Sequence, residues 1–187
     1  MQLNNSAKRV WKSYDELPRM QLPDGLAKKL QSKFIEVSGC YLLESTVPLN
    51  YLAQFKADPS AKQNKKWADE FFTPAGFEHA LSKIHIEDYV EDRHLDYAIS
   101  YIAGVFKLFA SQYPDKILRG IISRNNGFPP ENIFSCCVSH HLVREDDQLI
   151  PDETFDEKQN EENDSDDLLL TIDSNELFKL HHSFSQE

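Results

Sequence analysis

The residues best suited to chemistry lie in the sequence CCVSHH, which places Cys136, Cys137, His140 and His141 within six positions. Thiolates and imidazoles are common zinc ligands. In a helix, each Cys would lie one turn from the His four positions later, and each pair could bind an ion. In a strand, the members of each pair lie about 13 Å apart, too far for one ion. Because no second Cys or His cluster completes a four-ligand site, we predict that these residues belong to the core.

A second candidate is Glu91-x-x-His94, the spacing that one helix contributes to carboxylate-bridged di-iron sites. Such a site also needs a second Glu-x-x-His and two further Glu residues from facing helices. The chain contains no second copy of this motif. We therefore predict no metal and no cofactor, and keep as an alternative a metal-dependent helical enzyme that uses Glu91 and His94.

The sequence lacks motifs for covalent catalysis and for phosphate binding. Cys40, Cys136 and Cys137 have no nucleophile elbow or glycine-rich oxyanion turn around them. The chain contains neither G-x-G-x-x-G nor a Walker-type loop. Its basic clusters, such as Lys28-Lys29, are short and offset by acids, so they do not form the basic stripe typical of nucleic-acid binding. We expect a protein that is not an enzyme and does not bind nucleic acid directly.

The acidic residues are concentrated in two segments. HIEDYVEDRHLD, residues 85–96, has five acids that would stack as like charges on a helix, with only Arg93 to offset them. Residues 145–167 contain twelve Asp or Glu and one Lys. Residues 1–144 hold 16 acids and 18 bases, whereas residues 145–187 hold 15 acids and two bases, so the formal net charge of -11 comes from the last quarter of the chain.

This charge distribution predicts surfaces that bind a basic partner. The predicted partner-binding residues are Glu87, Asp88, Glu91, Asp92, Asp96, Glu145, Asp146, Asp147, Asp152, Glu153, Asp156 and Glu157.

Length and composition predict one globular domain in a reducing compartment. A chain of 187 residues with 40% hydrophobic residues is long enough to bury a core. No stretch is apolar enough for a membrane span or a secretory signal. Three cysteines, two of them adjacent, do not suggest a disulfide framework. We therefore predict a cytoplasmic protein with free thiols and no membrane association.

The elements that would position these residues are predicted to be mostly helices. Apolar residues at helical spacing predict helices over 24–45 and 86–113. A further helix is predicted to begin at Pro114 and to stop at Asn126-Gly127. Pro48 and Thr73-Pro74 are helix starts. Residues 130–144 fit a helix or a strand, LLLTI at 168–172 fits a buried strand, and Ser174 is expected to cap a short terminal helix.

The predicted fold is mainly α, a single-domain helical bundle or a short array of antiparallel α-hairpins with a minor C-terminal β element. The alternative is an α+β fold with a strand pair formed by 133–143 and 168–172. Residues 1–144 would form the helical domain, residues 145–167 an acidic, flexible loop, and residues 168–187 a segment that docks back on the domain.

These predictions favour a non-catalytic acidic protein that binds a basic protein. The most concrete version is an immunity protein or inhibitor that neutralises a nuclease-type toxin, because nucleases are basic around their active clefts. Besides the metal-dependent enzyme, a scaffold or chaperone module of a larger assembly remains an alternative.

Overall fold

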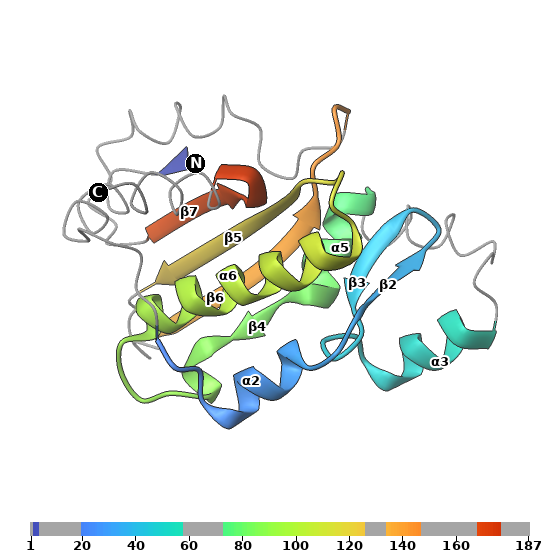
Figure 1. Ribbon diagram of the computed structural model, residues 1–187. Coiled ribbons are helices and arrows are strands. Elements are labelled where there is room, and N and C mark those ends of the chain that lie inside the picture. Colours follow the sequence, from blue (N-terminus) through green and yellow to red (C-terminus); the bar gives the residue numbers. More distant parts are fainter. Residues whose placement is uncertain (1, 4–19, 58–72, 126–133, 147–167, 177–187) are drawn as a thin grey trace.

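A computed structural model describes residues 2–3, 20–57, 73–125, 134–146 and 168–176 (Figure 1). Within these residues the fold is α+β, with two antiparallel sheets. The larger sheet contains, from edge to edge, β1 (Gln2–Leu3), β7 (Leu168–Asp173), β5 (Leu118–Asn125), β6 (Ser135–Leu142) and β4 (Ile84–His85). The smaller sheet is a hairpin of β2 (Phe34–Val37) and β3 (Cys40–Leu43).

Strand β5 is the centre of the larger sheet and pairs antiparallel with β6 on one side and with β7 on the other. Leu118 lies opposite Leu142 on β6, and Arg124 lies opposite Leu168 on β7. Strands β6 and β7 therefore run in the same direction, so the end of β6 and the start of β7 are at opposite ends of β5.

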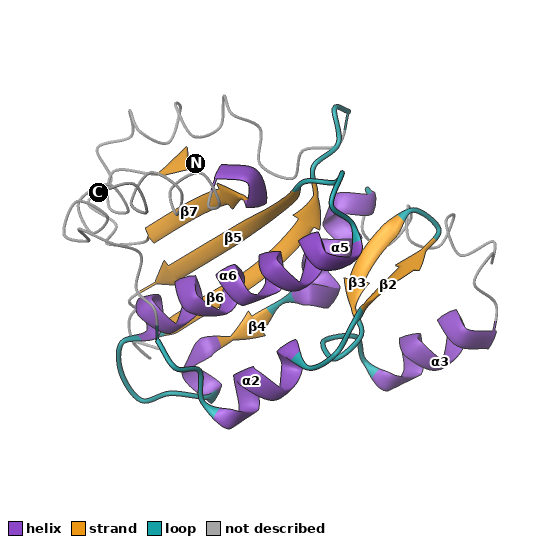
Figure 2. Cartoon of the chain, in the orientation of Figure 1, coloured by secondary structure: helices purple, strands orange, loops and turns teal. Residues whose placement is uncertain are grey.

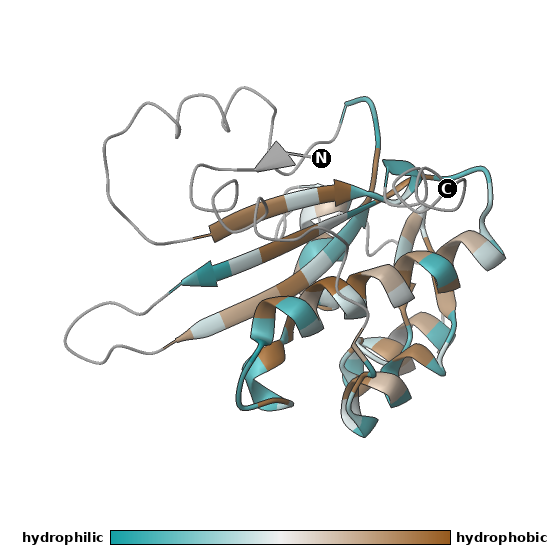
Figure 3. Ribbon diagram, turned by 60° about the vertical axis from the view of Figure 1, so that its left-hand side comes forward, coloured by the Kyte–Doolittle hydropathy of each residue, from teal (hydrophilic) through white to brown (hydrophobic). Residues whose placement is uncertain are grey.

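Helix α6 (His94–Gln112) lies across one face of this sheet, over β5 and β6 (Figure 2). Its buried face includes Ile102, Val105 and Phe109, which form one core with apolar residues of the strands such as Ile122 and Leu170. Figure 3 shows hydrophobic residues along β5, β6 and β7, as expected for a sheet that packs on a helix. No helix in the described part of the chain is long and apolar enough to cross a membrane.

Five shorter helical elements complete the described fold: α2 (Asp24–Leu30), α3 (Leu49–Ala57), α5 (Pro74–Ser82), the 3-10 turn η1 (Ile86–Asp88) and a helical turn at 174–176. Helix α2 packs beside α6. Helices α3 and α5 enclose a second apolar cluster with the β2–β3 hairpin, in which Leu42, Phe55 and Phe77 are buried.

A buried ion pair joins α5, the hairpin and the sheet. Glu78 on α5 is fully buried, and its carboxylate accepts the backbone N–H groups of Tyr41 at 2.6 Å and Leu142 at 2.8 Å. Arg144 donates to both oxygens of Glu78, at 2.7 and 2.9 Å, and to the carbonyl of Gly39 at 2.8 Å. Because the carboxylate is satisfied from three elements, it fixes their relative positions.

The prediction of a mainly helical bundle is wrong, because three of the predicted or ambiguous helical segments contain strands. Residues 34–43 are a hairpin rather than the end of a helix over 24–45, since Ser38 and Gly39 both adopt positive φ, 51° and 80°. Two consecutive left-handed residues form the tight turn typical of hairpins. The helix predicted between Pro114 and Asn126-Gly127 is strand β5, whose β-branched residues pack between two neighbours.

The alternative strand pair is also wrong in its pairing. Both segments are strands, as β6 and β7, but β5 lies between them. Other predicted elements are confirmed: Thr73 caps α5 by accepting the N–H of Gly76 at 3.0 Å, and a helix follows Pro48. A helical turn begins at Ser174 as predicted, but Ser174 is its first residue rather than its cap, and its hydroxyl accepts the N–H of Leu118 at 3.1 Å. The structure does not describe residues 147–167, which make up most of the flexible segment predicted at 145–167. It also does not describe residues 177–187.

Candidate functional site

Two short pieces of backbone bring together a histidine, a glutamate and a cysteine at the β4 edge of the larger sheet. In the β4–β6 ladder, Ile84 lies opposite Val138 and His85 lies opposite Cys137. Because side chains alternate along a strand, Ile84 and Val138 enter the core under α6 while His85 and Cys137 share the opposite face.

Glu87 extends the ladder beyond the end of β4. The chain turns into η1 after His85. Oε2 of Glu87 accepts the N–H of Cys136 at 2.9 Å, and so takes the place of the backbone carbonyl that a longer β4 would offer to β6. Its Oε1 lies 2.9 Å from Nδ1 of His85. Burial, the largest influence, raises the pKa of Glu87, but the hydrogen bonds from His85, Cys136 and Ser135 together outweigh it and the pKa is lowered.

The Cys137 thiol completes the cluster. Its Sγ is 3.6 Å from Nδ1 and 3.9 Å from Nε2 of His85, and 3.2 Å from the hydroxyl of Ser135. One ligand atom from each of His85, Glu87 and Cys137 lies within 4.8 Å of the other two. The side chain of His85 is 45% exposed and that of Glu87 22%, whereas Cys137 is buried at 8%. The cluster is therefore open to solvent on its histidine side.

The other residues of CCVSHH do not join this cluster. Cys136 and His140 point to the α6 side of the sheet, where burial raises the pKa of the Cys136 thiol to about 12 and lowers that of His140 to about 3. His140 packs edge-on against Phe34, with ring centroids 5.4 Å apart. The predicted core role thus holds for Cys136 and His140, while Cys137 lies in the cluster on the opposite face.

A second polar contact lies further along that opposite face of β6. The hydroxyl of Ser139 is 2.7 Å from Nδ1 of His79 on α5, and His141 is nearby and buried. Burial, followed by the electrostatic influence of His141 and Lys83, lowers the pKa of His79 to about 4. A neutral His79 suits this place because it needs no counter-ion.

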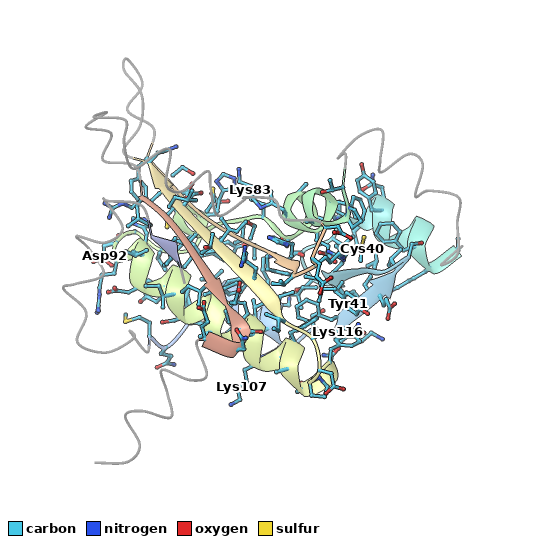
Figure 4. All side chains as sticks on the ribbon, turned by 90° about the horizontal axis from the view of Figure 1, so that it is seen from above. Cys40, Tyr41, Lys83, Asp92, Lys107 and Lys116 are labelled. Carbon is cyan, nitrogen blue, oxygen red and sulfur yellow. The ribbon has the colours of Figure 1, made fainter. Side chains whose placement is uncertain are left out.

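The acidic residues predicted to bind a partner fall into separate places. Asp88, Glu91 and Asp92 are exposed in the segment that includes the end of η1 and leads toward α6, which we call the acidic loop (residues 87–92). Asp96 is buried instead, and its carboxylate lies 2.7 Å from a guanidinium nitrogen of Arg93. Figure 4 places Asp92 at one end of the molecule, away from Lys83, Lys107 and Lys116.

The helix predicted over 86–113 begins only at His94, so Glu87, Asp88, Glu91 and Asp92 do not stack on a helix. Glu91 therefore lies outside the helix that carries His94, and the His94 ring packs against Phe134 at 4.6 Å. The geometry expected for the di-iron alternative is absent from these two residues.

The remaining predicted binding residues lie elsewhere. Glu145 and Asp146 are exposed just beyond the far end of β6, about 25 Å along the strand from the acidic loop. Asp147, Asp152, Glu153, Asp156 and Glu157 lie outside the described residues. The predicted binding residues that are described and exposed thus form two separate groups, one in the acidic loop and one just after β6.

Comparison with known proteins assigns the chain to a family. Residues 2–167 match the family described as uncharacterized protein PM0498. The chain belongs to this family. No curated protein and no solved structure matches the chain. The stretch shared with the PM0498 family includes His85, Glu87 and Cys137 as well as the acidic loop.

In this PM0498-family chain, sequence reasoning missed His85 as a partner of Cys137. The two residues are 52 positions apart, and the segment that contains His85 was expected to form a helix. The local signal for a strand is the alternation Lys83-Ile84-His85-Ile86, in which polar and apolar residues take turns.

Proposed function

We propose that this protein is a non-catalytic binding protein that engages a basic protein through the acidic loop. The observation that carries the proposal is that Asp88, Glu91 and Asp92 are all exposed and none is paired with a lysine or arginine among the described residues. Exposed like charges at one place attract an oppositely charged surface and speed its association.

The acidic loop is held in position from both sides. Glu87 is bonded to β6 through the Cys136 N–H. Tyr89 packs on the core, and a Cβ added to Gly25 on α2 would come within 2.7 Å of its ring. A loop that is already ordered loses little conformational entropy on binding, which favours affinity.

The partner we propose is a nuclease-type toxin, which this protein would neutralise as an immunity protein. A nuclease needs a basic cleft to bind phosphates, and carboxylates can occupy such a cleft in their place. We also propose a cytoplasmic location, since the three cysteines are buried as thiols rather than joined in disulfides, which suits a reducing compartment.

The test is affinity capture with the full-length chain at about 0.05 M and about 0.5 M salt, followed by identification of the bound proteins. The triple variant Asp88→Asn/Glu91→Gln/Asp92→Asn removes the three charges of the acidic loop. The matched control Glu36→Gln/Glu44→Gln/Asp115→Asn removes three charges elsewhere in the described structure, at positions not predicted to bind a partner.

We expect wild type and control to retain basic proteins at low salt only, and the triple variant to associate with the purified partner roughly tenfold more slowly. The proposal fails if the two triple variants behave alike, or if the retained proteins are not basic. The inhibitor role is tested separately: a captured nuclease should lose activity when one equivalent of the chain is added, and undiminished activity would reject that role.

A further inference from the structure

We propose that His85, Glu87 and Cys137 bind one zinc ion at the β4 edge of the sheet. This site does not depend on the proposed partner-binding function, and it lies at the base of the acidic loop. Imidazole, carboxylate and thiolate are the three side-chain types that coordinate zinc. A thiolate and a carboxylate together also balance the two positive charges of the ion.

The spacing of the three ligand atoms fits a zinc ion. Tetrahedral zinc, with bonds of about 2.3 Å to sulfur and about 2.0 Å to nitrogen, holds these two atoms about 3.5 Å apart. Sγ of Cys137 is 3.6 Å from Nδ1 of His85. The 2.9 Å between this nitrogen and Oε1 of Glu87 is shorter than the corresponding separation of about 3.3 Å, so the carboxylate would move outward by a few tenths of an ångström.

The same distances argue against a Cys–His–Glu catalytic triad. In a triad the nucleophile and the acid bind opposite nitrogens of the imidazole, so that the ring can relay a proton. Here Glu87 binds Nδ1, and the sulfur is slightly closer to Nδ1 than to Nε2, so the thiol is not paired with Nε2 alone. The acid and the thiol thus do not occupy opposite nitrogens, and both have Nδ1 as their nearest ring nitrogen, which suits a shared ion instead.

Two of the three proposed ligands are held in place by neighbouring residues, and the third can move to bind the ion. The Cys136 N–H holds the second oxygen of Glu87, and the Ser135 hydroxyl lies 3.2 Å from the Cys137 sulfur, so two ligands have outer partners. His85 is exposed and can rotate about its Cβ–Cγ bond to direct Nδ1 at the ion. Cys137 binds as the thiolate and releases its proton to solvent.

Three protein ligands leave a fourth position for water. Closed structural zinc sites use four protein ligands, whereas sites with three keep one position open. The exposed side of His85 faces solvent, so that position is accessible.

The experiment uses cobalt(II) as a spectroscopic substitute for zinc in the full-length protein. Cobalt bound to a thiolate absorbs in the near ultraviolet through sulfur-to-metal charge transfer, so the band reports cysteine ligation directly. We expect one cobalt per chain, with a charge-transfer band that added zinc abolishes. Competition with a chromophoric chelator then gives the dissociation constant for zinc.

Four variants test the cysteine and histidine ligands. Cys137→Ser should lose the band and weaken zinc binding at least about 100-fold, and Ser135→Ala should weaken it about tenfold. Cys40→Ser removes another buried thiol from a different part of the fold and should keep the band. His85→Gln changes an exposed side chain and should weaken zinc binding without altering the far-ultraviolet circular dichroism.

Three results would overturn the proposal: no charge-transfer band in the wild-type protein, a band unchanged in Cys137→Ser, or zinc affinity unchanged in His85→Gln. Because His85→Gln alters only an exposed residue, it decides the question even if Cys137→Ser fails to fold.

Discussion

Replacement of His140 by Leu is expected to stabilise the protein, and to do so more strongly in acid. The imidazole is buried on β6, and neither ring nitrogen has a hydrogen-bond partner in the described structure. A buried polar group without a partner costs about 1–3 kcal/mol. A leucine of similar volume should therefore raise the free energy of unfolding at neutral pH by about 1–2 kcal/mol.

The acid effect follows from the lowered pKa of His140. Burial, followed by His141 and His79, lowers this pKa from 6.5 to about 3. Because the folded-state pKa is below the unfolded value, the contribution to stability is present above pH 6.5 and is lost as the pH falls toward 3. At pH 5 the loss is about 2 kcal/mol, from about 1.4 kcal/mol per pH unit over about 1.5 units. Leucine does not titrate, so the variant avoids this loss.

Urea unfolding followed by circular dichroism, at about pH 7.5 and about pH 5, measures both effects. The advantage of His140→Leu over wild type should grow from about 1–2 to about 3–4 kcal/mol. His140→Gln is the matched control, because its amide does not titrate but is still a buried polar group: it should weaken the pH dependence without stabilising the protein at neutral pH. A Leu variant less stable than wild type at both pH values, or with an unchanged pH dependence, would refute the reasoning.

Further predictions concern the buried ion pair and two glycines. Arg144→Met should lower the free energy of unfolding by about 3–5 kcal/mol, because it leaves the fully buried Glu78 carboxylate without its cation. Glu78→Gln should cost less, because Arg144 is 20% exposed and keeps its bond to Gly39. A double-mutant cycle in urea should give a coupling energy above about 1 kcal/mol, and a value near zero would contradict the contact. Gly39→Ala should cost about 1 kcal/mol in thermal unfolding because φ is 80° there, whereas Gly39→Asn should cost less. Gly25→Ala favours the helix by about 1 kcal/mol but should lower Tm, because the new Cβ meets the Tyr89 ring. In a Tyr89→Ala background the same change should raise Tm, and a lower Tm there would count against this contact.

Local signals in the sequence were sufficient for some elements of the fold. Thr73 followed by Pro74 predicts the start of α5, because an N-cap hydroxyl and a proline at the first helical position act within one turn. The run LLLTI predicts β7, since a short apolar run rich in Leu and Ile suits a buried strand.

Elements whose conformation depends on distant partners were not predictable in this way. Residues 118–125 have apolar spacing that fits a helix as well as a strand, and pairing with β6 and β7 decides for the strand. Ser38-Gly39 is a turn signal within a stretch whose apolar residues also fit helical spacing, and the hairpin prevails because its strands pack in two cores.

The cluster at the β4 edge depends on register, which the sequence does not reveal. Cys137 and Glu87 were both candidates from their residue types, but for different roles. Only the pairing of His85 with Cys137, and the turn at η1 that follows, bring the three side chains together. A shift of one residue in this pairing would place His85 and Cys137 on opposite faces of the sheet.

The place of β7 between β1 and β5 also determines the order in which the sheet can be completed during synthesis. Residues 84–142 contain β4, α6, β5 and β6 and can pair as soon as they leave the ribosome. Gln2 has to await Thr171, which is 169 positions later in the chain, and such long-range closure is slow. Until then one edge of β5 has no partner strand and can pair with another chain. The twelve acidic residues of 145–167 are synthesised in this interval, and their charge would oppose aggregation of the nascent chain at the open edge.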